Sequence, residues 1–166
     1  GGEALLQVRP LTELFRKAKA LGVNTCLDTS AQPFSRKENF FPAFEQLMHF
    51  TDLVLLDIKH IDSDAHKQLT GWDNRGILDC ARYLSDIHKP VWIRYVLVPG
   101  INDDDESLHR YRAFLDTLDN VERVEVLPYH SLGVYKWEQL GIPYTLKEVE
   151  PPTEESLRHV RKILTE

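Results

Sequence analysis

Several polar side chains that could do chemistry stand at the carboxyl ends of strand-like apolar segments, or inside one of them: Asp28, Thr29, Asp57, Lys59, Arg94 and His130. In parallel α/β proteins, binding and catalytic groups gather at the carboxyl ends of the strands. Carboxylates, an ammonium group and a guanidinium group in one place suit a charged ligand or covalent chemistry at the lysine. These residues are the first candidates for a functional site.

The spacing and surroundings of these residues indicate which interactions each side chain could make. Asp57 and Lys59 are two residues apart, so on a strand both point to the same side, where they could also form a structural ion pair. Arg94 interrupts an apolar segment, and an unpaired buried charge costs several kcal/mol. It therefore needs an anionic partner, either a structural carboxylate or a ligand. Asp28 has a structural alternative as well, because it could cap the next helix.

The residues alone leave two functions open. One is a barrel-type lyase in which Lys59 forms a Schiff base next to Asp57. The other is a site for a zwitterionic ligand, in which the carboxylates meet an ammonium group and Lys59 or Arg94 meets an anion. The sequence contains neither a glycine-rich phosphate loop nor a Gly-x-Ser-x-Gly motif, so nucleotide-phosphate binding and a nucleophile elbow are unsupported.

Apolar periodicity predicts the elements that must position these side chains. The predicted strands are 24–29, 53–59, 91–100 and 124–130, and the predicted helices are 10–21, 39–50, 64–69, 74–87, 104–118 and 153–165. Nearly continuous apolar runs favour strands covered on both faces. Segment 131–152 is predicted to be an ordered loop. This alternation of strand and helix fits a small doubly wound sheet or part of a barrel.

Length and composition limit the class of protein. The 166 residues predict a single domain, 1–166. The formal net charge of −6 argues against a nucleic-acid partner. No apolar run is long enough to span a membrane and no signal-peptide pattern is present, so we expect a cytoplasmic location. The two cysteines, Cys26 and Cys80, are too few for an iron–sulfur site and are predicted to be core residues.

Five stretches, in order and with nearly constant spacing, resemble one family of radical S-adenosylmethionine enzymes, the activases of glycyl radical enzymes. They are residues 1–7, 26–29, 51–59, 91–100 and 127–137. The long third strand and the Leu-Pro-Tyr-His sequence at 127–130 are the most specific of them. The resemblance displaces the Schiff-base role of Lys59.

The resemblance implies a reaction and its partners. In that family a reduced 4Fe-4S cluster cleaves S-adenosylmethionine, and the resulting 5′-deoxyadenosyl radical abstracts a hydrogen atom from one glycine of the lyase. The implied protein substrate is pyruvate formate-lyase, and the implied electron donor is a protein such as flavodoxin. Residues Tyr135, Lys136 and Trp137 are our prediction for a contact with a partner protein.

The resemblance also implies a set of cofactor-binding residues: Gly1, Gly2, Glu3, Asp28, Thr29, Asp57, Lys59, Arg94, Val96, Leu127 and His130. The turn at 1–3 resembles the one that receives the methionine ammonium group, where glycines let the backbone approach a ligand closely. Val96, Leu127 and His130 resemble contacts around the ribose and adenine.

Charged residues account for the rest of that implied site. Asp28, Thr29 and Asp57 resemble the oxygen ligands of a monovalent cation beside the methionine carboxylate. Lys59 resembles a contact on the carboxylate side, and Arg94 resembles a polar contact.

The implied fold is a partial (β/α) barrel, of which this α/β chain would form four parallel strands with flanking helices. The family's Cys-x3-Cys-x2-Cys motif precedes its Gly-Gly-Glu turn. We therefore expect the chain to be the C-terminal two-thirds of such an enzyme, without the cluster-binding segment and inactive alone. A strand edge left open predicts self-association. The alternative is a non-catalytic module that binds a glycyl radical enzyme or S-adenosylmethionine.

Overall fold

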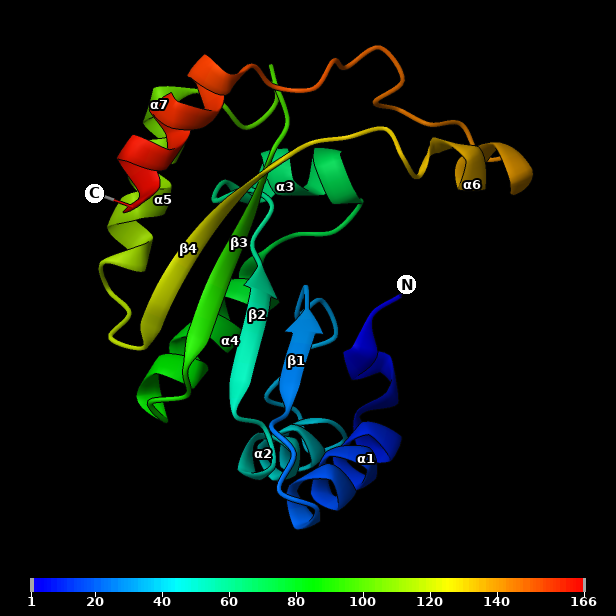
Figure 1. Cartoon of the computed structure of the whole chain (residues 1–166), viewed down its shortest axis with the longest axis vertical. Coiled ribbons are helices and arrows are strands. Elements are labelled where there is room, and N and C mark those ends of the chain that lie inside the picture. The colour runs from blue at the N-terminus through cyan, green and yellow to red at the C-terminus, as the bar shows by residue number, and fades with distance from the viewer. Residues whose placement is uncertain (1, 166) are drawn as a thin grey trace.

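The computed structural model describes residues 2–165 and consists of one parallel sheet with helices between its strands (Figure 1). The strands are β1 (Cys26–Thr29), β2 (Leu53–Asp57), β3 (Val91–Leu97) and β4 (Val121–Pro128). The longer helices are α1 (Val8–Ala20), α2 (Phe41–His49), α3 (Ser63–Thr70), α4 (Arg75–Asp86), α5 (Asp105–Leu115) and α7 (Glu154–Thr165). Every predicted strand and helix is present, with shifted ends.

Strand order decides between the two predicted architectures. All three strand pairs are parallel, and the order β1-β2-β3-β4 follows the chain. A doubly wound sheet reverses its order at a switch point, whereas a barrel adds each new strand on the same side. The prediction of a partial barrel with four parallel strands and flanking helices is confirmed.

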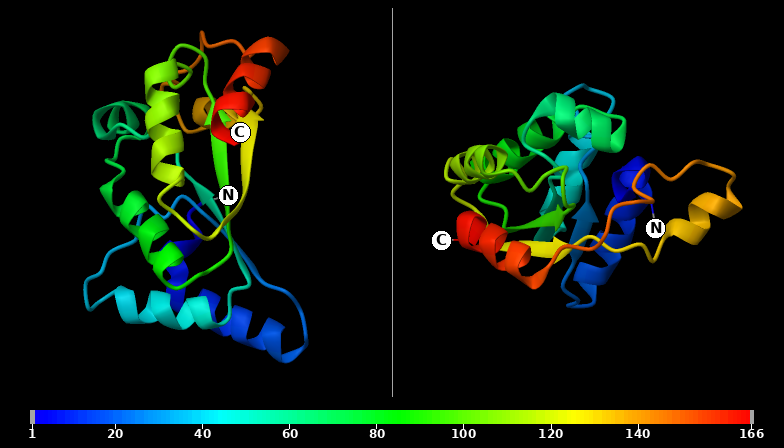
Figure 2. Two further views of the ribbon diagram at one scale, coloured as in Figure 1. Left: turned by 90° about the vertical axis from the view of Figure 1, so that its left-hand side faces the viewer. Right: turned by 90° about the horizontal axis from the view of Figure 1, so that it is seen from above.

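One face of the sheet is covered and the other is open. Helices α3, α4 and α5 lie on one side (Figure 2), and exposure alternates along β1, β2 and β3. Leu27, Leu56 and Ile93 are buried on the helical side, whereas Asp28 and Arg94 lie on the open face. The prediction of strands covered on both faces is therefore wrong for the described residues.

Cys26 follows the same alternation. It lies on the open face of β1 and is exposed, whereas Cys80 is fully buried in α4. The prediction of a core cysteine is right for Cys80 and wrong for Cys26, because an edge strand with one open face exposes every second residue.

Two short helices were not predicted. The 3-10 helix η1 (Ala4–Gln7) precedes α1, and α6 (Val134–Gln139) lies inside the segment predicted as a loop. The chain from 131 to 152, which we call the arm, carries α6 away from the sheet beyond the carboxyl ends of the strands (Figure 1). Within residues 2–165, no helix is long and apolar enough to cross a membrane.

Candidate functional site

The sheet brings the charged candidates together on its open face. Asp57 on β2 is directly beside Arg94 on β3, and Asp28 on β1 is beside Leu55 of β2. The Nε atom of Arg94 donates to Oδ1 of Asp57 at 3.0 Å. Its terminal nitrogens lie 3.0 and 3.1 Å from the two carboxylate oxygens of Asp28. Arg94 on β3 therefore connects to both β2 and β1.

Lys59 completes this set, and its Nζ atom donates to Oδ2 of Asp57 at 3.0 Å. We call Asp28, Arg94, Asp57 and Lys59 the charge ladder. Two carboxylates and two cations balance, so the partner that Arg94 required is structural in this state. Burial alone would lower the pKa of Arg94, but Asp57 and Asp28 outweigh it and raise that pKa.

Glu3 fastens the N-terminal turn to the end of β1. Its carboxylate accepts hydrogen bonds from the Ser30 amide at 2.9 Å and the Ser30 hydroxyl at 2.7 Å, and also from the Thr29 hydroxyl. It also accepts from the Leu5 amide at 3.0 Å, which caps η1. Burial acts to raise the pKa of Glu3, but these hydrogen bonds prevail and lower it.

A polar cavity of about 450 Å³ lies between this turn and the charge ladder. Its lining consists of Gly2, Glu3, Asp28, Thr29, Ser30, Asp57 and Arg94. Gly2 has a φ of 110°, a backbone conformation that favours glycine. Gly1, the remaining predicted residue of the turn, lies outside the described residues.

An apolar cavity of about 610 Å³ contains the other predicted residues, Lys59, Val96, Leu127 and His130. The two cavities adjoin, because the carboxylate of Asp57 in the first is 3.0 Å from the ammonium group of Lys59 in the second. Both volumes are typical of small-molecule sites. Every predicted site residue within 2–165 therefore lines one of two neighbouring cavities.

The arm supplies lining residues that the sequence did not reveal. Tyr144, Leu146 and Trp137 contribute to the apolar cavity. The Tyr129 hydroxyl lies 2.8 Å from that of Tyr144 and donates to the Leu146 carbonyl at 3.1 Å. Tyr129 directly precedes the predicted site residue His130, so the sequence could have indicated that it lines the cavity. Tyr144 and Leu146 come from an irregular segment without periodicity, so no sequence signal pointed to them.

Trp137 lines the apolar cavity, with its ring centroid 5.4 Å from that of Tyr144, and its side chain is still exposed. Tyr135 and Lys136 are exposed as well. A contact of these three residues with a partner protein stays a prediction.

The described residues do not fit an iron–sulfur cluster or a preformed metal site. Between residues 2 and 165, no group of three or more histidine, cysteine, aspartate or glutamate side chains could hold a metal ion. A 4Fe-4S cluster needs cysteine thiolates. The space between Asp28 and Asp57 contains the guanidinium group of Arg94, and the Thr29 hydroxyl is bonded to Glu3.

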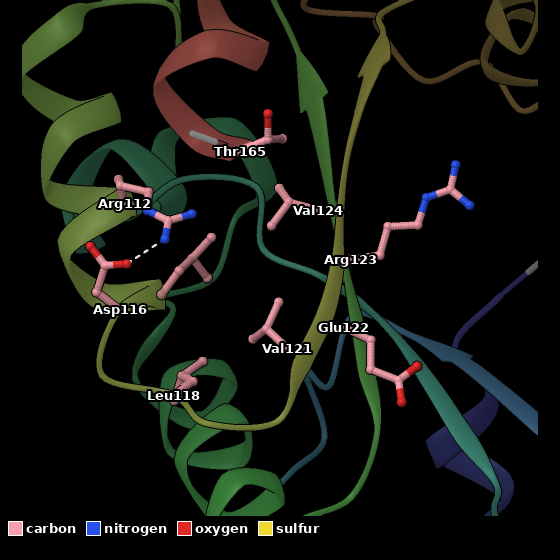
Figure 3. Close-up of a pocket in the computed structure, with 9 residues that line it drawn as sticks. Arg112, Asp116, Leu118, Val121, Glu122, Arg123, Val124 and Thr165 are labelled. Atoms are coloured by element: carbon pink, nitrogen blue, oxygen red, sulfur yellow. Dashed lines mark hydrogen bonds and ion pairs between the residues drawn. The ribbon is translucent and has the colours of Figure 1, made fainter.

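A cavity of about 460 Å³ at the amino end of β4 lies apart from these residues (Figure 3). Arg112 points toward Asp116 and forms an ion pair with it, whereas Glu122 and Arg123 project to the other side of β4. Because Arg112 and Asp116 neutralise each other, and because sites of parallel α/β proteins lie at the opposite end of the strands, we assign no ligand to it.

Several known proteins resemble this chain in sequence. No family model matches the chain. The chain is 56% identical over 158 residues to the pyruvate formate-lyase-activating enzyme of Staphylococcus epidermidis, covering 95% of the chain and 63% of the relative. It is 53% identical over 164 residues to the enzyme of the same name from Streptococcus mutans, covering 99% of the chain and 62% of the relative. The chain thus spans less than two thirds of the length of these curated relatives.

Solved structures resemble it as well. A crystal structure of a domain of pyruvate-formate lyase-activating enzyme from Bacteroides vulgatus has a TM-score of 0.79 and 25% identity, over 99% of this chain and 89% of that one. Streptococcus suis SuiB bound to a precursor peptide has a TM-score of 0.68 and 18% identity, over 99% of this chain and 33% of that one, and shows the fold alone.

The strand order and the solved structures that the chain resembles define an α/β protein with the partial barrel of the radical S-adenosylmethionine enzymes. In sequence, the chain is a homologue of the pyruvate formate-lyase-activating enzymes. The predicted relationship to that family is confirmed.

Proposed function

We propose that the chain is part of an activase that generates a glycyl radical on pyruvate formate-lyase by reductive cleavage of S-adenosylmethionine. The observation that carries the proposal is the pair of adjoining cavities, one polar and one apolar, lined by the residues that the family resemblance implies. Such a pair matches a ligand with an amino-acid end and a nucleoside end. The similarity to activating enzymes supports the reaction.

The charged residues would hold the amino-acid end. In the ligand-free state the cations of the charge ladder are satisfied by Asp28 and Asp57. A ligand carboxylate would bind Lys59 or Arg94, and its ammonium group would take the carboxylate thus released. The exchange keeps the charges balanced, which suits a zwitterion. The Schiff-base lyase is disfavoured, because an ammonium group paired with Asp57 is not the neutral amine that attacks a carbonyl.

The apolar cavity would hold the nucleoside end. Val96 and Leu127 offer apolar surface, and His130 and two tyrosines are among the lining residues that carry polar groups. S-adenosylmethionine supplies the radical when its sulfonium bond is reductively cleaved. The part of these residues is to bind and orient the molecule.

Electron transfer is outside the reach of these 166 residues. With two cysteines in the sequence, they cannot provide the three thiolates of the family's cluster motif. We expect the cluster and a donor such as flavodoxin to act through other parts of the complete protein. Anaerobic iron–sulfide reconstitution of this chain should give no reducible 4Fe-4S signal in electron paramagnetic resonance (EPR), and such a signal would refute this part of the proposal.

A monovalent cation beside Asp28 and Asp57 belongs to the proposal only in the liganded state. The oxygens are of the type that such a cation prefers, but the guanidinium group of Arg94 fills the space between them. Exchanging potassium chloride for tetramethylammonium chloride should change ligand affinity and leave the melting temperature of the ligand-free chain unchanged.

A cytoplasmic location stays a prediction.

A chimera tests the reaction. The matched residues of the Staphylococcus epidermidis enzyme would be replaced by this chain, and the cluster content would be measured first. We expect the chimera to produce a glycyl-radical EPR signal on pyruvate formate-lyase, and we expect the same chimera with Asp57→Asn to lose it. A chimera that holds its cluster, binds S-adenosylmethionine and forms no radical would favour the alternative of a non-catalytic binding module.

A further inference from the structure

The site contains a gap between two strands that a side chain outside the cavities closes. Pairing between β2 and β3 ends at Asp57 and Arg94, followed by one longer contact from the Ile58 amide to the Arg94 carbonyl at 3.4 Å. Beyond this point the chain reaches Lys59, while β3 continues to Val96. Lys59 and Val96 both line the apolar cavity, so their separation affects the shape of this cavity.

Asn102 spans that gap. It is fully buried, and its side-chain nitrogen donates to the Lys59 carbonyl at 3.1 Å and to the Val96 carbonyl at 2.9 Å. Its side-chain oxygen accepts from the Val98 amide at 2.7 Å. These partners fix the amide orientation, because two carbonyls need a donor and an N–H group needs an acceptor.

A second connection runs through two tyrosines. The Tyr111 hydroxyl donates to the Ile58 carbonyl at 3.2 Å, and the Tyr95 hydroxyl donates to the backbone carbonyl of Asn102. The two rings pack edge to face at 4.9 Å. The loop after β3 is therefore attached both to the chain end after β2 and to the helical layer, which makes Asn102 a fixed point.

We propose that Asn102 is a positioning residue that holds Lys59 and Val96 at the separation the ligand needs, through their backbone carbonyls. It touches neither cavity in our structure, so it acts through the two residues that do. The consequence for ligand affinity rests on the proposed function. The positioning itself does not, because the hydrogen bonds are present without a ligand.

Asn102→Asp removes the hydrogen bonds that the Asn102 amide donates and keeps the packing of the side chain. Aspartate has nearly the same shape, but an ionised carboxylate offers no donor and repels both carbonyls. Once protonated, the same carboxyl can donate one hydrogen bond. The defect of Asn102→Asp should therefore decrease as the pH is lowered from about 8 to about 6, since burial raises the pKa of such a carboxyl.

The chain offers a matched control at the other end of the sheet. Asn120 is also buried, and its side-chain nitrogen donates to the Lys89 carbonyl at 2.6 Å, beside the amino end of β3. Asn120→Asp removes the same type of hydrogen bond far from both cavities. Each variant would be studied at a temperature equally far below its own melting temperature.

Two measurements on the 166-residue chain test whether Asn102 positions Lys59 and Val96. Amide hydrogen exchange of the ligand-free chain should increase in peptides covering 57–61 and 96–102 for Asn102→Asp only. Calorimetry with S-adenosylhomocysteine should show a loss of affinity of about tenfold or more for Asn102→Asp, partly recovered at low pH, and little change for Asn120→Asp.

Two results would overturn the proposed role of Asn102, and a third would count against the proposed function instead. Unchanged exchange at 57–61 in Asn102→Asp, or equal losses of affinity in the two variants, would overturn the proposal. A wild-type chain that binds no S-adenosylhomocysteine would count against the proposed function, and the exchange result would then still decide the role of Asn102 on its own.

Discussion

Asp57 is shared by both cations of the charge ladder, and its side chain is only 14% exposed. Arg94 and Lys59 each donate to a different oxygen of its carboxylate, at 3.0 Å. The carboxylate therefore orders two side chains that would otherwise repel each other. Asp28, with a side chain 57% exposed, anchors only the outer end of Arg94.

Asp57→Asn should lower the free energy of unfolding by about 1–3 kcal/mol, because an amide cannot accept two charge-assisted hydrogen bonds and leaves the two cations unscreened. Urea denaturation measures the change. Asp79→Asn is the control, since Asp79 pairs with Arg36 on an exposed surface and should cost less than about 1 kcal/mol. Equal losses of unfolding free energy in the two variants would show that the charge ladder stabilises the chain no more than an exposed ion pair does.

Glu3 predicts a pH dependence of stability. Its pKa in the folded chain is below the ordinary value of 4.5, so its hydrogen bonds contribute fully above pH 4.5 and are lost as the pH falls through the folded pKa. The difference in unfolding free energy between wild type and Glu3→Gln should thus be constant above pH 4.5 and shrink below it. A difference that grows on acidification would contradict the assigned hydrogen bonds.

At the scale of elements, the long loop between β1 and α2 packs on the helical side of the sheet rather than over the cavities. Phe34 in this loop is 5% exposed and meets Phe44 edge to face at a centroid distance of 5.1 Å. The ring of Tyr83 in α4 lies 6.1 Å from that of Phe34 and 6.0 Å from that of Phe44, so the three rings form one cluster. Arg36 lies over the Tyr83 ring and pairs with Asp79, which fastens the loop to α4.

Phe34→Ala should destabilise the chain by about 3–5 kcal/mol, because it removes the centre of an aromatic cluster and leaves a cavity. Thermal unfolding followed by circular dichroism measures this. Trp72→Ala, at a side chain 64% exposed, should change stability by less than about 1 kcal/mol. A comparable effect of the two substitutions would mean that the loop is not part of the core.

The elements also show what the sequence could and could not predict. Nearly continuous apolar runs located all four strands. These runs did not reveal that one face is open, since Leu53 and Leu55 are apolar and still half-exposed. Side chains at the strand ends were predictable as a site, but Tyr144 and the role of Asn102 depend on loops whose path only the folded chain defines.

At the scale of the whole molecule, the open face and the outer edge of β1 define how the chain meets its surroundings. Among the described residues β1 pairs with β2 alone, and η1 lies near its other side. An unpaired strand edge is a template for further pairing. In a complete barrel of this type, additional strands would occupy that position.

The chain should therefore self-associate at high concentration. Sedimentation velocity from micromolar to near-millimolar protein should show the weight-average sedimentation coefficient increasing with concentration. A single monomeric species over the whole range would show that the β1 edge is protected, and the prediction of self-association would be wrong.

The most direct test of the central claim is isothermal titration calorimetry of the chain with S-adenosylmethionine. The two adjoining cavities predict saturable binding of one molecule per chain, and Asp57→Asn should weaken it at least about tenfold because the charge ladder then fails to orient its cations. No detectable binding by the folded wild-type chain, or equal binding by wild type and Asp57→Asn, would contradict the assignment of these cavities to the cofactor.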